Sequence, residues 1–125
     1  MIKPKKLNAV TIAVRDLDRS LKWYREHFGF ERLFDVEGGV VIGADGVELV
    51  VSQVGDPAHA PLVNHAVDVC VRLFAFEVTE EDFARVKDEF PEDKDIVEID
   101  HPRYKSYITE DLDGHCIELY VDKAA

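Results

Sequence analysis

Two glutamates occupy matching points of a phrase that the sequence repeats. The first copy covers residues 45–51 (DGVELVV) and the second covers residues 113–121 (DGHCIELYV). In each copy an Asp-Gly turn leads into a strand-like run with one acid, Glu48 or Glu118, among apolar residues. A glutamate placed in this way can bind a metal ion, act as a general base or hold a cationic ligand. The plainer alternative is a strand glutamate that only contacts water.

The alternation of side chains along a strand predicts which face the two glutamates take. The apolar residues of each copy share one face, namely Val47, Leu49 and Val51 in the first and Ile117, Leu119 and Val121 in the second. Because these apolar faces must pack against helices, we expect Glu48 and Glu118 on the opposite face. Without a metal ion, two facing carboxylates repel each other and one tends to hold a proton, which suits a weak acid–base pair.

The elements that position the glutamates follow the same order in each half. In the first half, a strand at 7–14 precedes a helix that Asp16 opens and Gly29 ends. Its apolar face is predicted from the spacing of Leu17, Leu21, Tyr24 and Phe28. Three strands follow, at 31–36, 40–43 and 47–53.

The second half repeats this order with a strand at 71–78 and one helix with Thr79 as its cap. Phe83, Val86 and Phe90 mark the buried face of that helix, and Pro91 ends it. Its last three strands are expected at 95–100, 104–110 and 115–121. The fold class is therefore α+β: two βαβββ modules forming a cupped mixed β-sheet with helices outside. We expect residues 1–125 to form one domain, with module one at about 7–53, a linker at 54–69 and module two at about 70–122.

Length and composition exclude several classes of protein. A chain of 125 residues with 46% hydrophobic residues can bury a core, and no apolar run is long enough to span a membrane. The net charge of −11 opposes binding to nucleic acid or to an anionic membrane surface. The two cysteines do not make a disulfide framework, and no signal sequence is evident, so we expect a cytoplasmic protein.

Three motifs give the chain a resemblance to a known superfamily. Residues 7–20 (LNAVTIAVRDLDRS) look like its opening strand and helix, and residues 23–30 contain the Trp-Tyr and Phe-Gly-Phe pattern of its helix ending. Residues 110–119 (EDLDGHCIEL) look like its closing hairpin. The chain resembles the vicinal oxygen chelate superfamily, which includes glyoxalase I, extradiol dioxygenases and the fosfomycin and bleomycin resistance proteins.

The resemblance implies a cup in each module and, in metal-using members, a histidine on the first strand and a glutamate on the last. Glu48 and Glu118 match the carboxylate positions, but Ala9 and Leu73 stand at the histidine positions. A catalytic divalent site needs three or more protein ligands. We therefore expect no cofactor and no metal. The alternative is a divalent ion (Mn, Fe, Ni, Zn or Mg) held by Glu48 and Glu118, with a loop histidine such as His65 or water completing the shell.

We expect mostly small and apolar residues to line the ligand-binding cup, beside the two acids: Ala9, Thr11, Ala13, Glu48, Val50, Ser52, Leu73, Ala75, Cys116, Glu118 and Tyr120. Tyr107 is added because the strand that holds it often binds substrate in the family that the chain resembles; an ordinary strand surface is the alternative. Among the histidines, His59 and His65 lie in the predicted linker and His101 in a predicted turn, whereas His115 follows a turn at the start of the strand that carries Glu118. Cys116 is expected to be a buried thiol and not a nucleophile.

Two classes of function follow. In the first, the chain is a small-molecule binding protein without the usual His/Glu metal site, similar to bleomycin resistance proteins, with a small organic ligand of cationic character. In the second, it is a metal-dependent lyase, isomerase or dioxygenase with a rearranged site, so whether it is an enzyme stays open. A third reading is a degenerate regulatory subunit with an occluded cup. The resemblance also implies a homodimer.

Overall fold

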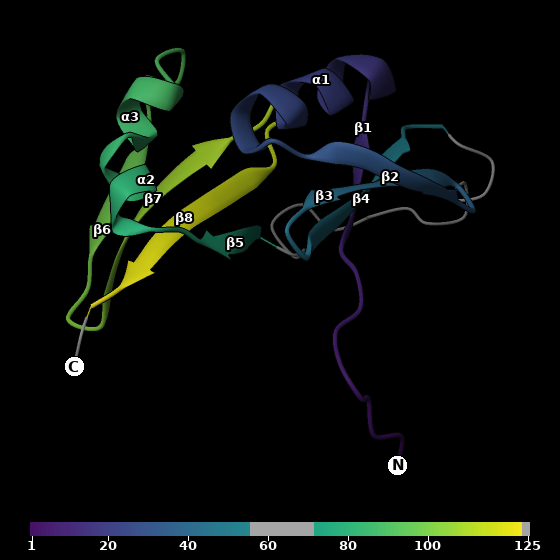
Figure 1. Ribbon diagram of the computed structural model, residues 1–125, viewed down its shortest axis with the longest axis horizontal. Coiled ribbons are helices and arrows are strands. Elements are labelled where there is room, and N and C mark those ends of the chain that lie inside the picture. Colours follow the sequence, from purple (N-terminus) through teal and green to yellow (C-terminus); the bar gives the residue numbers. More distant parts are fainter. Residues whose placement is uncertain (56–71, 124–125) are drawn as a thin grey trace. The chain divides into compact units, whose positions relative to one another are not determined.

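The computed structural model describes residues 1–55 and 72–123 (Figure 1). The chain divides into two compact units, Met1–Val63 and Asn64–Ala125. The division falls inside the predicted linker, most of which lies outside the described residues. The described part of each unit holds one predicted module.

Unit 1 contains one helix and a four-stranded mixed sheet. Its elements are β1 (Thr11–Val14), α1 (Leu17–Phe28), β2 (Glu31–Val36), β3 (Gly39–Ala44) and β4 (Val47–Gln53). The strand order is β1-β4-β3-β2, with β1 and β4 parallel and the other pairs antiparallel. The glutamate strand β4 therefore lies inside the sheet, between the first strand and the third.

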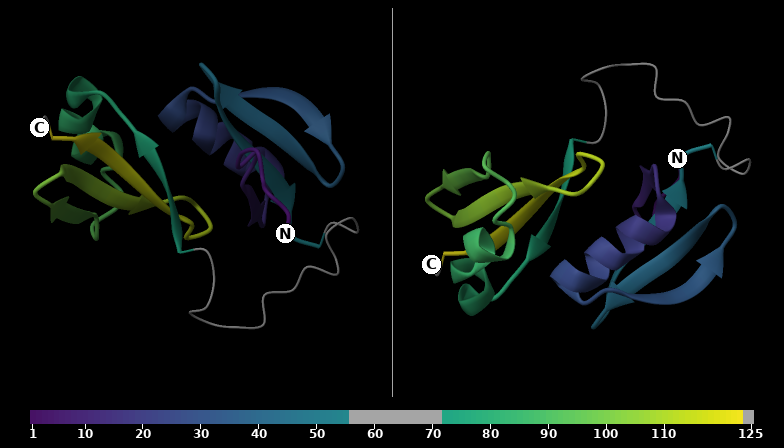
Figure 2. Two further views of the ribbon diagram at one scale, coloured as in Figure 1. Left: turned by 90° about the horizontal axis from the view of Figure 1, so that it is seen from below. Right: turned by 90° about the horizontal axis from the view of Figure 1, so that it is seen from above.

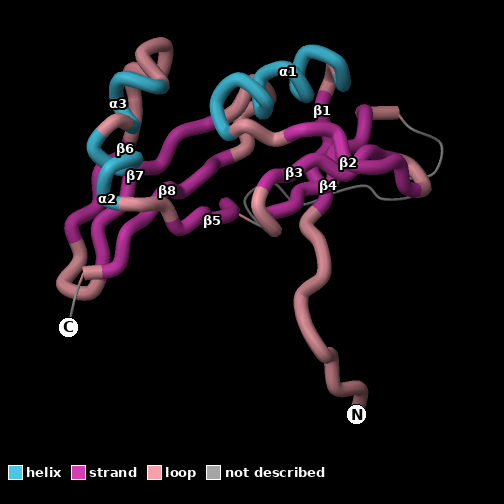
Figure 3. The backbone as a smooth tube through the Cα atoms, viewed as in Figure 1, coloured by secondary structure: helices cyan, strands magenta, loops and turns pink. Residues whose placement is uncertain are grey.

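Unit 2 repeats this topology. Its elements are β5 (Leu73–Glu77), α2 (Glu80–Ala84), α3 (Val86–Glu89), β6 (Val97–Asp100), β7 (Tyr104–Glu110) and β8 (Cys116–Asp122). The order is β5-β8-β7-β6, and again the first and last strands pair in parallel (Figure 3). The predicted α+β class with two βαβββ modules is confirmed.

Local sequence signals explain the ends of α1. The side chain of Asp16 accepts a hydrogen bond from the Arg19 amide at 3.1 Å, which satisfies one of the free N–H groups of the first turn. Gly29 ends the helix in the left-handed region, with φ of 68°, and its amide donates to the Arg25 carbonyl. The Leu17 amide also donates to the side chain of Gln53, which ties the start of α1 to the end of β4.

The second helix differs from the prediction. One helix was expected from Thr79 to Phe90, but the structure has two short ones, α2 and α3, that meet at Arg85. The Arg85 amide bonds to the Asp82 carbonyl, three residues back, and this tighter turn ends α2. Its predicted buried face is correct, because Phe83, Val86 and Phe90 are all buried.

Three predicted strands are longer than those in the structure. The strands expected at 7–14, 71–78 and 95–100 are observed as Thr11–Val14, Leu73–Glu77 and Val97–Asp100. The register of the hydrophobic pattern is unaffected, since Ile12 and Val14 are buried while Thr11 and Ala13 are exposed. In each unit the helices cover one face of the sheet (Figure 2). Among the described residues, no helix is long and apolar enough to cross a membrane.

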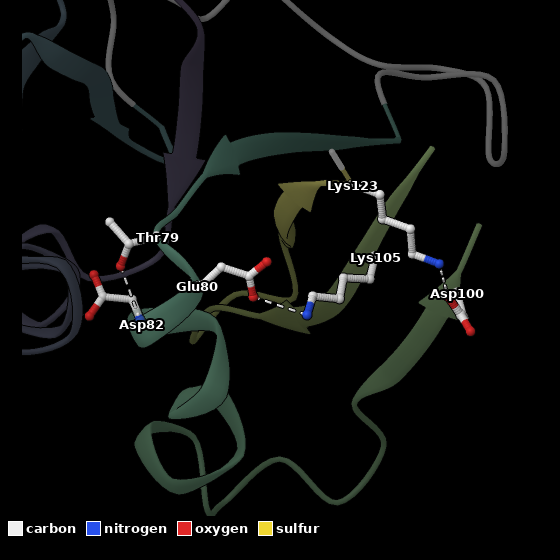
Figure 4. A network of polar contacts seen from close by, with 6 residues as sticks. All are labelled: Thr79, Glu80, Asp82, Asp100, Lys105 and Lys123. Atoms are coloured by element: carbon white, nitrogen blue, oxygen red, sulfur yellow. Dashed lines mark hydrogen bonds and ion pairs between the residues drawn. The ribbon is translucent and has the colours of Figure 1, made fainter. Parts of the chain in front are cut away.

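An aromatic stack joins the helices of unit 2 to its sheet. The rings of Phe83 on α2 and Tyr107 on β7 are stacked, with centroids 4.6 Å apart. The ammonium group of Lys105 lies 5.0 Å from the Phe83 ring centroid. It also forms an ion pair with Glu80 at 3.0 Å, which Figure 4 shows. The ammonium group of Lys87 lies 5.5 Å from the Tyr107 ring. These contacts reinforce a helix layer whose two helices are both short.

The cap of α2 yields a test of stability. Thr79 accepts a hydrogen bond from the Asp82 amide at 3.1 Å (Figure 4). We predict that Thr79→Ala lowers the free energy of unfolding by about 1 kcal/mol, as loss of an N-cap usually does. Urea unfolding followed by circular dichroism measures this change. Thr79→Ser keeps the hydroxyl acceptor and should retain most of the stability; an equal loss in both variants would contradict the role of the cap.

The contact between Lys123 and Asp100 yields a test of pH dependence. The hydrogen bond and charge of Lys123 lower the pKa of the Asp100 carboxyl (Figure 4). A lowered folded-state pKa adds stability above the unfolded-state value, and that stability is lost as pH falls through the folded value. We predict that Lys123→Gln raises the pKa of Asp100 toward its ordinary value, measured by NMR titration of its carboxyl carbon. Lys94→Gln, whose ammonium group contacts the Pro91 carbonyl, should leave that pKa unchanged.

Candidate functional site

Glu48 lies on the face of the unit 1 sheet that α1 does not cover. Its neighbours in β4, Leu49 and Val51, are buried with at most 2% of their surface exposed, whereas Glu48 is exposed. Val50 and Ser52 share the face of Glu48 by alternation. The predicted inward packing of β4 agrees with the burial of Leu49 and Val51 and with the exposure of Glu48, but Val47, at the start of the strand, is 44% exposed and does not share in it.

The strand beside Glu48 carries no metal ligand. β1 pairs with β4 so that Thr11 faces Val50 and Ala13 faces Ser52. The Val50 amide also donates to the Val10 carbonyl at 3.0 Å, which continues the pairing one step before the strand. If this register is continued for two residues before Thr11, Ala9 lies beside Glu48. A methyl group there offers no donor atom.

On the other side of Glu48 the neighbouring strand carries a glycine. Gly43 of β3 is the direct partner of Glu48. A Cβ atom at Gly43 would lie 2.2 Å from the Val47 carbonyl oxygen and 3.2 Å from the Glu48 side chain. No other residue fits without moving the strand, so the sequence keeps the place beside the Glu48 carboxylate free of a side chain.

Glu118 takes the corresponding place in unit 2. Ile117 and Leu119 are buried against the helices, with at most 3% exposed, while Glu118 is half-buried on the other face. Cys116 and Tyr120 are half-buried and share its face by alternation, so the expectation that Cys116 is a buried thiol is wrong. We call this side of the unit 2 sheet the Glu118 face. It comprises Cys116, Glu118, Tyr120 and the residues that pair with them on the neighbouring strands.

The partner of Glu118 on the first strand is Ala75. Leu73, which the motif alignment places at the histidine position, pairs instead with Cys116. Compared with the alignment of the motifs, the first strand of unit 2 is therefore shifted by two residues against its glutamate strand. Neither Ala75 nor Leu73 can bind a metal ion, so this shift supplies no missing ligand.

Ser106 is a site residue that the sequence analysis missed. Its hydroxyl donates a hydrogen bond to a carboxylate oxygen of Glu118 at 2.8 Å, and Ser106 itself is fully buried. β7 pairs with β8 so that Ser106 faces Tyr120, one step along the same face. No signal within β7 alone could have found it, because the face that Ser106 takes depends on the register of β7 against β8.

The turn between β7 and β8 sets this register. One carboxylate oxygen of Asp111 accepts hydrogen bonds from the amides of Asp113 and His115, each at 2.9 Å. The Asp111 amide donates to the His115 carbonyl, and Gly114 has a φ of 85°. This aspartate fixes where β8 begins and therefore which of its residues share the face of Glu118.

The structure corrects one predicted cup residue. Tyr107 pairs with Leu119, and its ring stacks on Phe83 of α2. Its side chain therefore lies on the helix-covered face, opposite to Glu118. The resemblance indicated the right strand, but alternation along β7 turns Ser106 and Ile108 toward Glu118 and Tyr107 away from it.

The other candidate histidines lie apart from the glutamates or outside the described residues. His101 belongs to the turn before β7, where its Nδ1 accepts a hydrogen bond from the Arg103 amide at 3.1 Å and its ring stacks on Tyr104. His115 lies in the turn that Asp111 closes. His59, His65 and Cys70 lie outside the described residues. Within residues 1–55 and 72–123, no three His, Cys, Asp or Glu side chains gather into a group that could hold a metal ion.

The remaining predicted cup residues are distributed over the two units. Thr11, Ala13, Val50 and Ser52 accompany Glu48 in unit 1, whereas Leu73, Ala75, Cys116 and Tyr120 accompany Glu118 in unit 2. That these residues bind a ligand stays a prediction.

Solved structures with the same fold come from several bacteria. A glyoxylase/bleomycin resistance protein/dioxygenase domain from Frankia sp. EAN1pec is 17% identical, with a TM-score of 0.75 over 98% of this chain and 96% of that one. The fosfomycin resistance protein FosX from Listeria monocytogenes is 16% identical, with a TM-score of 0.65 over 98% and 96%. TioX from Micromonospora sp. ML1 is 24% identical, with a TM-score of 0.64 over 92% and 97%.

Among curated proteins no match is found. A family model, in contrast, matches residues 6–119, which include both glutamates and all but the end of the second module. With that match, and with two βαβββ modules in the structure, the chain belongs to the Glyoxalase/Bleomycin resistance protein/Dioxygenase superfamily.

Proposed function

We propose that the chain is a small-molecule binding protein of this superfamily that works without the usual His/Glu metal site, and that its ligand is an organic cation. The observation that carries the proposal is the pair formed by Ser106 and Glu118. A fully buried hydroxyl holds one carboxylate oxygen at 2.8 Å on the sheet face that the helices leave uncovered.

This hydrogen bond favours recognition over mere solvation. A glutamate that only contacts water has no need of a buried donor, and its side chain samples several rotamers. Ser106 fixes the orientation of the Glu118 carboxylate and leaves the second oxygen available to a ligand. Ordering the acid before binding reduces the entropy that a ligand must offset.

The residues around the two glutamates favour an organic cation over a metal ion. The residues beside the two glutamates on the first strands are alanines, Ala9 and Ala75, and alanine cannot complete a coordination shell. Half-buried Cys116 and Tyr120 flank Glu118. A carboxylate with apolar and aromatic neighbours suits an ammonium or guanidinium group on an organic body better than a hard divalent ion.

The overall charge supports the same class of ligand. With a net charge of −11, the field around the protein attracts cations and repels anions. We also propose a homodimer, on the basis of the superfamily resemblance, and a cytoplasmic location, on the basis of the two cysteines and the N-terminal sequence. Sedimentation at micromolar concentration tests the dimer, and a monomer there would contradict it.

A binding measurement with a charge-matched control tests the proposal. Metal-free bleomycin, a cationic glycopeptide, is titrated into the protein by isothermal calorimetry. We predict that Glu118→Gln weakens binding by about tenfold or more, since a charge-assisted hydrogen bond is lost. Glu92→Gln, in the turn after α3, removes the same net charge far along the chain and should change affinity little.

Two outcomes would overturn the proposal. The first is a titration that gives no heat at high protein concentration, or one in which Glu118→Gln and Glu92→Gln weaken binding equally. Equal weakening would mean that Glu118 contributes only to the overall negative charge. The second is stoichiometric Mn, Fe, Ni, Zn or Mg in purified protein that is lost in Glu118→Gln. That result would establish the alternative, a metal-dependent lyase, isomerase or dioxygenase.

The contact between Ser106 and Glu118 can be tested separately by a double-mutant cycle. We predict that Ser106→Ala lowers the free energy of unfolding by about 1 to 2 kcal/mol, because a hydrogen bond to a charged acceptor is lost at a partly buried site. Urea unfolding of Ser106→Ala, Glu118→Gln and the double variant gives the coupling energy. Strictly additive losses would show that the two side chains do not depend on each other.

A further inference from the structure

The edge strand β2 contains an extra residue that changes which side chains face the ligand side of unit 1. Glu31 pairs with Gly43 and Arg32 with Ile42, but the next pair is Phe34 with Val41, so Leu33 has no partner. Leu33 is a β-bulge. Strict alternation would place Glu31 and Phe34 on opposite faces; the bulge places them on the same one.

The pairing across the sheet shows which face this is. Gly43, the partner of Glu31, is also the partner of Glu48, and Val41, the partner of Phe34, is also the partner of Val50. Glu31 and Phe34 therefore lie on the face of Glu48. Val36 follows two residues after Phe34 and lies there too.

Glu31 and Glu48 form a pair of acids in one row of the sheet, and the strand between them contributes only a glycine to that row. They belong to strands separated only by β3, whose residue in that row is Gly43. With neighbouring strands about 4.8 Å apart, the two Cα atoms are about 10 Å apart, a gap that two glutamate side chains can span around one cationic group. Both side chains are exposed, and no hydrogen bond or ion pair engages either one in the part of the chain that the structure describes.

An exposed apolar surface lies beside the two acids. Phe34 is 53% exposed and Val36 is 39% exposed, and Val50 in the next strand but one is half-buried. The Phe34 ring is one row along the sheet from Glu31 and Glu48. An aromatic face next to two carboxylates attracts a cation both by charge and by the quadrupole of the ring.

The composition of this face selects its occupant. Divalent ions such as Mg²⁺ and Ca²⁺ require about six oxygen ligands, whereas this face offers two carboxylates among apolar groups. A symmetric contact with a second copy would bring the same surface, with the same two acids, against itself. An organic cation with an apolar body satisfies both the acids and the exposed apolar side chains.

We propose that Glu31 and Phe34 form, with Glu48, a recognition site on unit 1 for a primary ammonium group attached to an aromatic or alkyl body. Glu31 and Glu48 hold the ammonium group from two sides of Gly43, and Phe34 packs against the carbon skeleton. This inference rests on the proposed function, because it assumes the same class of ligand, an organic cation. The residues that it assigns belong to unit 1, whereas the proposed function rests on Glu118 in unit 2.

The experiment is an NMR titration of the full chain with 2-phenylethylammonium as the probe and 2-phenylethanol as its neutral counterpart. The expected dissociation constant for so small a probe is on the order of millimolar. Amide shifts should centre on residues 31, 34, 43 and 48, and the alcohol should cause much smaller ones. Glu31→Gln and Phe34→Leu should each weaken binding at least threefold.

Glu26→Gln is the matched control, because it removes one negative charge from α1, on the opposite side of the same sheet. The inference would be overturned if Glu26→Gln and Glu31→Gln weakened binding equally, or if 2-phenylethanol bound as tightly as 2-phenylethylammonium. Amide shifts centred on other residues would also overturn it. So would binding of Mn²⁺ alone with line broadening centred on residues 43 and 48. If bleomycin binding depends on Glu118 while the Glu31→Gln titration matches wild type, the inference fails and the proposed function stands. If the probe binds through Glu31 while bleomycin gives no heat, the proposed function fails instead.

Discussion

The parallel pairing of first and last strands governs the rest of each unit. Because β4 and β8 insert between the first strand and the third, both edges of each glutamate strand are hydrogen-bonded. The buried residues of these strands, Leu49 and Val51 in one unit and Ile117 and Leu119 in the other, then fix which face the helices cover. A slip of one residue would bury the glutamates and expose the core, so the burial of four aliphatic side chains determines the position of two carboxylates.

Much of this arrangement was predictable from local patterns. Periodicity of two predicted the faces of Glu48 and Glu118. The predicted bounds of β2, β4 and β7 are correct, and helix signals at Asp16 and Gly29 predicted the ends of α1. The break at Arg85 was not predictable from the apolar spacing, because Phe83, Val86 and Phe90 remain on one side whether or not the helix is continuous.

The wrong predictions at the site have a common cause. The register between two strands cannot be predicted from the sequence of either strand alone. Tyr107 was assigned by its strand, but its face depends on the pairing of β7 with β8, which the turn at Asp111 sets. The register also makes Ala75 and not Leu73 the partner of Glu118. Phe34 was missed because the bulge at Leu33 resets alternation within β2, and an extra residue of this kind leaves no periodic signal.

The two units have kept the same topology while their glutamate faces have become different. In unit 2 the acid is held by a buried serine, and in unit 1 it stands beside a glycine and a second acid. The superfamily name spans enzymes and resistance proteins, and these differences between the faces are where such divergence of chemistry can arise without a change of fold.

The bulge at Leu33 also bears on how the protein behaves in a concentrated solution. β2 is an edge strand, and a flat edge with free N–H and C=O groups is a template for the growth of a sheet from one molecule to the next. All six residues of β2 are exposed, and they include Leu33, Phe34 and Val36, which would favour such growth. A bulge twists the edge and interrupts its row of hydrogen-bonding groups. The inserted residue, together with the charged Glu31, Arg32 and Asp35, thereby opposes the addition of another chain to an edge strand that exposes three large apolar side chains.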